Sequence, residues 1–348
     1  MERLIIMRKL ALTLLLGTAL PAFASVQSDI RGGLSAADAY KKATSACESA
    51  SCQEQAIADL ITAGVSVDVV LATALSSSVS TEQAVASVMN AALKSGVSAE
   101  KAVASVMKAA LDSADLGNAE AVSLVSTAAI KSGKTDVATV MKAATDSGVA
   151  KVDAASVVSS AAIETGIVTV AEAMTAAVAT GLSQTDAAST VSIAALATGK
   201  VDVKTVLEAA IKTGVSESAA VAVATIALTV TTTGQADITS VIKAAQDVGV
   251  DTGEALSAIA ATGTETSVIE AAAAENNIAP DVVEAAAEAP APAEVATVAA
   301  AAAAVATEAV IATTAANPTA SGGADTTGTP SVDNVIPDIV VNDDISDS

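Results

Sequence analysis

The segment that decides the fold runs from Gly133 to Gly148 and reads GKTDVATVMKAATDSG. The third residue after its first glycine is Asp136, a residue type that accepts hydrogen bonds from the free amides of a helix's first turn. Apolar side chains with the spacing of one helical face follow at Val137, Val140, Met141 and Ala144. The closing glycine can adopt the left-handed conformation that ends a helix. The segment therefore predicts one short amphipathic helix.

The same glycine punctuation recurs along the chain. The glycines are Gly133, Gly148, Gly166, Gly181, Gly199, Gly214, Gly234 and Gly249. Their successive gaps are 15, 18, 15, 18, 15, 20 and 15 residues, so a short half and a long half make a period of 33, and the gap of 20 contains an insertion of two residues. This pattern predicts pairs of helices repeated in tandem.

The short halves begin with the same kind of residue. The third residue after the glycine is Asp or Thr, which predicts helix N-caps at Asp136, Thr169, Asp202 and Asp237, and a further helix start at Thr266 after Gly263. Helices of this length are marginal alone in water, so each needs neighbours. We therefore predict an all-α fold, an α-solenoid of about six short hairpins over residues 53–289.

The amino terminus has the features of an export signal. Arg3, Arg8 and Lys9 precede an apolar run, and Ala22 and Ala24 supply the small residues that signal peptidase requires. Residues 1–24 are therefore predicted to be a signal peptide, with cleavage before Ser25. A retained membrane anchor is the alternative, but the apolar run is short for one. We expect the protein to be exported to the periplasm, the cell surface or the extracellular space.

The two cysteines, Cys47 and Cys52, are five positions apart. An exported chain meets oxidising conditions, which favours a structural disulfide between them. A redox-active pair is the alternative, but the spacing is not Cys-x-x-Cys and no neighbouring cation would lower a thiol pKa. We predict that residues 25–52 form a capping segment at the amino end of the array.

Composition argues against several classes of function. Without residues 1–24, 14 basic and 38 acidic residues remain, a net charge of −24 that would repel nucleic acid. The chain has no histidine, the commonest general base and transition-metal ligand. No nucleophile or phosphate-loop motif occurs. We therefore expect no enzyme activity, no cofactor and no metal site.

The carboxyl-terminal part differs in composition from the repeats. Residues 290–348 contain no basic residue and are predicted to be a low-complexity acidic tail, mostly disordered. The alanine-rich stretch 293–316 could be interpreted as a membrane span, but Glu294 and Glu308 interrupt it and alanine is barely favourable in a bilayer. We expect no stable membrane span in the mature chain.

These features favour a structural or scaffolding protein, with self-assembly through the ends of the array as an extension. Association with itself or with a protein partner is therefore expected. The alternative is a binding module whose solenoid face recruits a peptide, a polysaccharide or a cationic partner. Without Trp, and with Phe23 in the signal, such contacts would be weak and polar. An ice- or crystal-surface binder is a third class, suggested by regular Thr, Ser and Ala faces.

Overall fold

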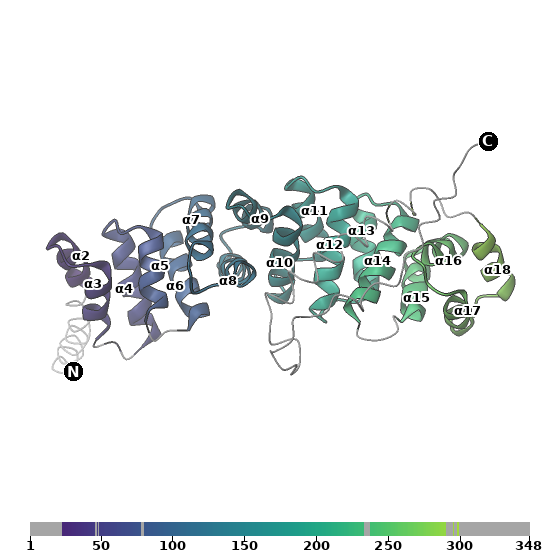
Figure 1. The fold of residues 1–348 in the computed structure, drawn as a ribbon, viewed down its shortest axis with the longest axis horizontal. Coiled ribbons are helices and arrows are strands. Elements are labelled where there is room, and N and C mark those ends of the chain that lie inside the picture. The colour runs from purple at the N-terminus through teal and green to yellow at the C-terminus, as the bar shows by residue number, and fades with distance from the viewer. Residues whose placement is uncertain are drawn as a thin grey trace, which may run out of the picture. The chain divides into compact units, whose positions relative to one another are not determined.

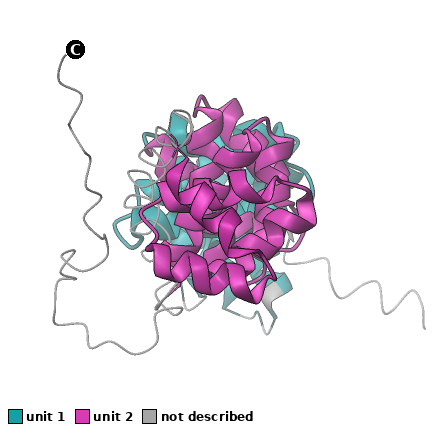
Figure 2. Ribbon diagram, turned by 90° about the vertical axis from the view of Figure 1, so that its right-hand side faces the viewer, with its two compact units in different colours: residues 1–148 teal, residues 149–348 magenta. Residues whose placement is uncertain are grey.

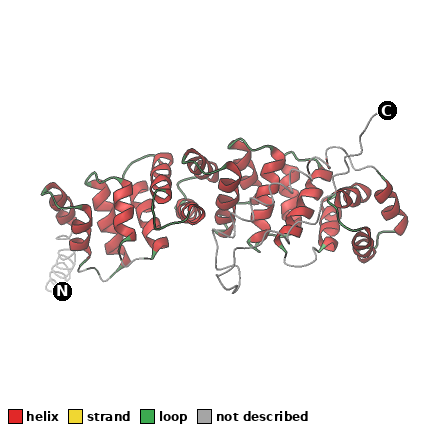
Figure 3. Ribbon diagram, in the orientation of Figure 1, coloured by secondary structure: helices red, strands yellow, loops and turns green. Residues whose placement is uncertain are grey.

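A computed structural model describes residues 23–289, apart from 46, 48, 78–79 and 233–236, together with Val295 and Val298. Over these residues the chain is helical, with short turns and no strand (Figure 3). Helices pack on their neighbours in tandem, so the predicted all-α solenoid of short helical hairpins is confirmed. The expectations for residues 1–22 and, apart from the two valines, for the tail from 290 onward lie outside the described residues.

The chain divides into two compact units at the turn between α9 (Val137–Asp146) and α10 (Lys151–Glu164). The first unit is Met1–Gly148 and the second is Val149–Ser348 (Figure 2). The sequence predicts one array over residues 53–289, and nothing in the glycine spacing marks this division. Each unit is a tandem array with its own core.

The helices of the first unit are short and follow one another closely along the chain (Figure 1). They are α2 (Phe23–Arg31), α3 (Ala36–Thr44), α4 (Ala50–Thr62), α5 (Val67–Leu75), α6 (Thr81–Lys94), α7 (Ala99–Leu111), α8 (Asn118–Lys131) and α9 (Val137–Asp146). Even-numbered helices pack on even-numbered ones and odd on odd, which makes two layers. Because α2 and α3 pack on α4 and α5 in this way, the hairpin pattern begins before residue 53.

The second unit repeats this arrangement. Its helices are α10 (Lys151–Glu164), α11 (Val170–Ala179), α12 (Gln184–Ala197), α13 (Val203–Lys212), α14 (Glu217–Thr231), α15 (Ile238–Val248), α16 (Thr252–Ala261), α17 (Thr266–Glu275) and α18 (Pro280–Glu288). Here α10, α12, α14, α16 and α18 form the even layer, and α11, α13, α15 and α17 form the odd layer. From α4 onward the described residues form seven hairpins followed by α18, one more hairpin than expected.

Four of the odd-numbered helices, α9, α11, α13 and α15, bury a fixed set of positions. In α13 the first, fourth, fifth, seventh and eighth residues are buried, namely Val203, Val206, Leu207, Ala209 and Ala210. The same five positions are buried in α9, α11 and α15. A large side chain at position five and alanines at positions seven and eight let neighbouring helices pack closely without voids. The same small set of core contacts therefore recurs in these four helices.

None of the helices between Phe23 and Glu288 is both long enough and apolar enough to cross a bilayer.

Candidate interaction surface

The four predicted N-cap residues begin odd-numbered helices, α9 in the first unit and α11, α13 and α15 in the second. Asp136 and Asp202 each accept a hydrogen bond of 2.8 Å, from the backbone amides of Thr139 and Thr205. Asp237 accepts a longer one, 3.3 Å, from the amide of Ser240. Thr169 forms a reciprocal capping box with Glu172. These side chains are thus engaged in starting helices.

Capping also changes the acidity of these carboxyl groups. Hydrogen bonds from Thr139 lower the pKa of Asp136, and those from Thr205 lower the pKa of Asp202. The backbone amide and hydroxyl of Thr169 lower the pKa of Glu172. Donors that stabilise the carboxylate produce all three shifts. The shifts therefore have a structural cause and mark no catalytic acid or base.

The predicted turn glycines adopt the conformation that ends helices. Gly133, Gly148, Gly166, Gly181, Gly199, Gly214 and Gly249 all have positive φ, whereas Gly234 lies outside the described residues. One helix start departs from the expected register, because Glu265 is the N-cap of α17 and Thr266 is its first residue. The turn after Gly263 is one residue shorter than its counterparts, which moves the start.

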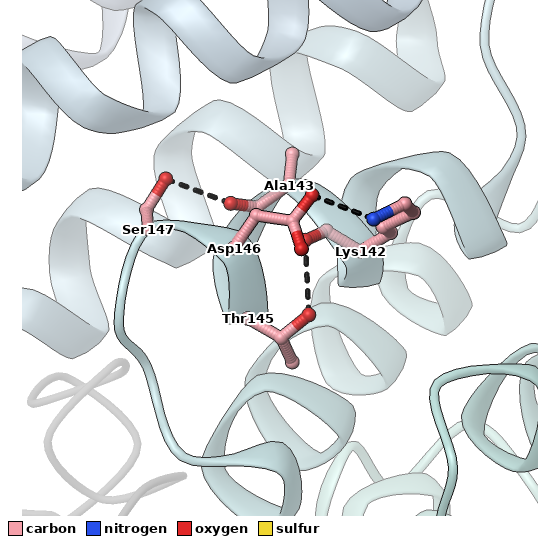
Figure 4. Close-up of polar contacts among 5 residues, drawn as sticks. All are labelled: Lys142, Ala143, Thr145, Asp146 and Ser147. Atoms are coloured by element: carbon pink, nitrogen blue, oxygen red, sulfur yellow. Dashed lines mark hydrogen bonds and ion pairs between the residues drawn. The ribbon is translucent and has the colours of Figure 1, made fainter.

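Sequence reasoning missed a polar residue just before most of these glycines. It is Ser or Thr, and its hydroxyl donates to a carbonyl in the last turn of the helix. The acceptors are three or four residues back, in the pairs Ser132 to Ala129, Ser147 to Ala143, Thr165 to Ala162, Thr180 to Ala177, Thr198 to Ala195 and Thr213 to Ala210. Figure 4 shows this at the end of α9, where Thr145 adds a hydroxyl bond and Lys142 pairs with Asp146. The repeated dipeptide Ser/Thr-Gly is the signal that could have revealed it.

The two cysteines lie together at the junction of α3 and α4. Cys47 and Cys52 are at disulfide-bonding distance, with their Cα atoms 5.6 Å apart. Cys52 belongs to the first turn of α4, and Cys47 lies in the preceding connection. A bond between them would hold that connection against the helix that follows it.

The carboxyl-terminal helices of the second unit carry an unbalanced charge. Between Lys243 and residue 290 the chain has nine acidic residues and no basic one. All nine are exposed: Asp247, Asp251, Glu254, Glu265, Glu270, Glu275, Asp281, Glu284 and Glu288. We call this set the acidic surface. Its potential favours cations and repels anions.

A shallow groove of about 470 Å³ lies within the acidic surface, between α16 and α18. Its lining is Gly253, Glu254, Ser257, Asp281, Val282, Ala285, Ala286 and Ala289. Two carboxylates therefore stand beside a mostly aliphatic floor. This combination suits a lysine or arginine side chain, whose apolar stem can lie on the floor while its charged head meets a carboxylate.

Among the described residues, no group of three acidic, cysteine or histidine side chains lies close enough together to hold a metal ion. The sequence matches no protein-family model and no curated protein.

Proposed function

We propose that this chain is an exported, non-catalytic structural or scaffolding repeat protein of the periplasm, the cell surface or the extracellular matrix. The observation that carries the proposal is the repeated core, in which the same five positions are buried in α9, α11, α13 and α15. Repeats of this kind extend an array by stacking one similar helical hairpin on the next. The cysteine pair at bonding distance is compatible with an oxidising compartment.

Self-assembly is the finer form of this proposal. A tandem array has two terminal faces that can meet head to tail, and contacts of that kind propagate instead of closing. The test is light scattering and negative-stain microscopy of the purified mature protein over a wide concentration range. Filaments or concentration-dependent oligomers are expected, and a strict monomer at the highest concentration would refute self-assembly.

The acidic surface favours a second function, binding of a cationic protein segment in the groove between α16 and α18. The supporting observation is the pair Glu254 and Asp281 beside the aliphatic floor. Because the groove is shallow and the carboxylates are exposed, the attraction should weaken steeply with added salt.

This second function is tested by measuring the binding of a synthetic helical peptide in which short runs of alanine alternate with short runs of lysine. Neutralising the two groove carboxylates in the double variant Glu254→Gln and Asp281→Asn should weaken binding about tenfold. The matched control is Glu284→Gln with Glu288→Gln, which removes the same charge from exposed positions outside the groove. Equal losses in both double variants would mean that only net charge matters and that the groove is no site.

A further inference from the structure

The even-layer helix α12 is buried on every side. All nine residues from Ala187 to Ala195 are buried, including Thr190 at 0 % exposure and Ile193 at 1 %. Nine consecutive residues span two and a half helical turns, so they point in all directions around the axis. In α14 the ten residues from Ala219 to Leu228 are buried in the same way.

The described helices account for three sides of α12. It packs on α10 and α14 within the even layer and on α11 and α13 of the odd layer. In a two-layer array the fourth side of such a helix faces away from the odd layer and has no neighbour. No further described helix contacts α12. Another part of the chain must therefore cover that side.

The first unit provides an internal comparison. Helix α8 occupies the same place in the repeat as α12, and its Ser123, Leu124, Thr127 and Ala128 are only half-buried. The residues 66 positions later in α12 are Ser189, Thr190, Ile193 and Ala194, and all of them are buried. Contacts within the repeat alone thus leave this face partly exposed. The complete burial of this face in α12 and α14 requires a further contact that the repeat does not provide.

The segment after α18 meets the requirements for the cover. Its two described residues, Val295 and Val298, are helical and only 1 % and 6 % exposed, so these two side chains pack against other parts of the protein. Residues 293–316 are 24 positions with only two charges, Glu294 and Glu308. As a helix they would extend about 36 Å, at about 1.5 Å per residue, which spans three or four helices packed about 10 Å apart.

We propose that residues 293–316 of the same chain lie across the open face of α10, α12 and α14. Val295, Val298 and Val305 fall on one helical face, which would meet the small side chains of that layer. The segment is then an internal occupant of the solenoid face that a binding module would offer to a partner. This inference is independent of the scaffolding proposal.

The test uses single cysteines as reporters of cover, because the native cysteines lie at bonding distance from each other. Thr190→Cys reports on the proposed covered face, and Ala210→Cys reports on the core between the layers. Leu124→Cys, at the same repeat position as Thr190 but in α8, is the matched control. Thiol labelling is measured in the mature chain and in a chain that ends at Ala289.

In the shortened chain we expect the Thr190→Cys thiol to react at least about a hundredfold faster, while the Ala210→Cys thiol stays slow and the Leu124→Cys thiol reacts equally in both chains. Equal, slow labelling of Thr190→Cys in both chains would overturn the proposal. So would rates in the full chain that depend on protein concentration, because the cover would then come from a second copy.

If the shortened chain unfolds, its Ala210→Cys thiol will also react fast. The full chain carrying Val295→Asp and Val298→Asp then decides. Fast labelling of Thr190→Cys with slow labelling of Ala210→Cys supports the docked segment. Slow labelling of both, or fast labelling of both, overturns it, because a separable cover must leave the array folded when it detaches.

Discussion

The ammonium group of Lys200 donates a hydrogen bond to the backbone carbonyl of Glu164, with 2.6 Å between Nζ and O. Glu164 is the last residue of α10, and Lys200 lies in the turn between α12 and α13, so the contact joins successive hairpins. A cation at a helix carboxyl end is stabilised by the helix dipole and satisfies an acceptor that the helix leaves unpaired. Lys151 makes a similar but longer contact, 3.3 Å, with the carbonyl of Gly181.

Replacing Lys200 by Met should loosen the carboxyl end of α10. We expect a loss of about 0.5–1 kcal/mol, confined to the last turn, because the contact is exposed but meets a helix end. Hydrogen exchange of the amides near Glu164 measures it. In Lys142→Met, where the lost partner Asp146 is on the same helix, only α9 should respond. If either variant raised hydrogen exchange equally in α9 and α10, this interpretation would be contradicted.

Replacing Thr198 by Val should weaken the end of α12. The Thr198 hydroxyl donates to the carbonyl of Ala195 at 2.6 Å and accepts from the amide of Lys200 at 3.2 Å. Losing both bonds from a partly buried position should cost about 1–2 kcal/mol. Thr198→Ser keeps the hydroxyl and should lose far less. Urea unfolding followed by circular dichroism compares them, and equal losses would show that the hydroxyl contributes nothing.

Replacing Gly148 by Ala should strain the turn between α9 and α10. Gly148 has a φ of 97°, and a Cβ atom there would meet nothing within 4 Å, so the cost is conformational and not steric crowding. We expect a loss of about 1–2 kcal/mol in urea unfolding. Gly117→Ser is the contrast, because Gly117 has a φ of −74° at the N-cap of α8. Serine there should leave stability unchanged or raise it.

Asp202→Asn should reduce the dependence of stability on pH. The folded-state pKa of Asp202 is lowered, chiefly by its hydrogen bond with the Thr205 side chain. Its carboxylate therefore stabilises the fold above the unfolded-state pKa of about 3.9, and this contribution is lost as the pH falls through the lower folded value. Asparagine still caps the helix but does not titrate. The urea midpoints of the two proteins should differ at pH values near neutrality and converge in acid. A constant difference would be evidence against the linkage.

Helix starts and stops could be derived from the sequence because the interactions that set them are local. Asp136 caps the amide of Thr139, three residues away, and Gly148 ends α9 through its own backbone conformation. The Ser/Thr hydroxyls that precede the glycines are equally local. Reasoning from the glycines alone overlooked them, although the repeated dipeptide is plain in the sequence.

Local patterns by themselves determined that this protein is a tandem array of short helical hairpins, because capping and helical periodicity act within a few residues. Only the tertiary structure decided the division after Gly148, which the spacing of 18 residues to Gly166 does not mark. It also decided that Thr190 is buried while its counterpart Leu124 remains half-exposed. Burial depends on what lies across a helix from distant parts of the chain, and no window of neighbouring residues contains that information.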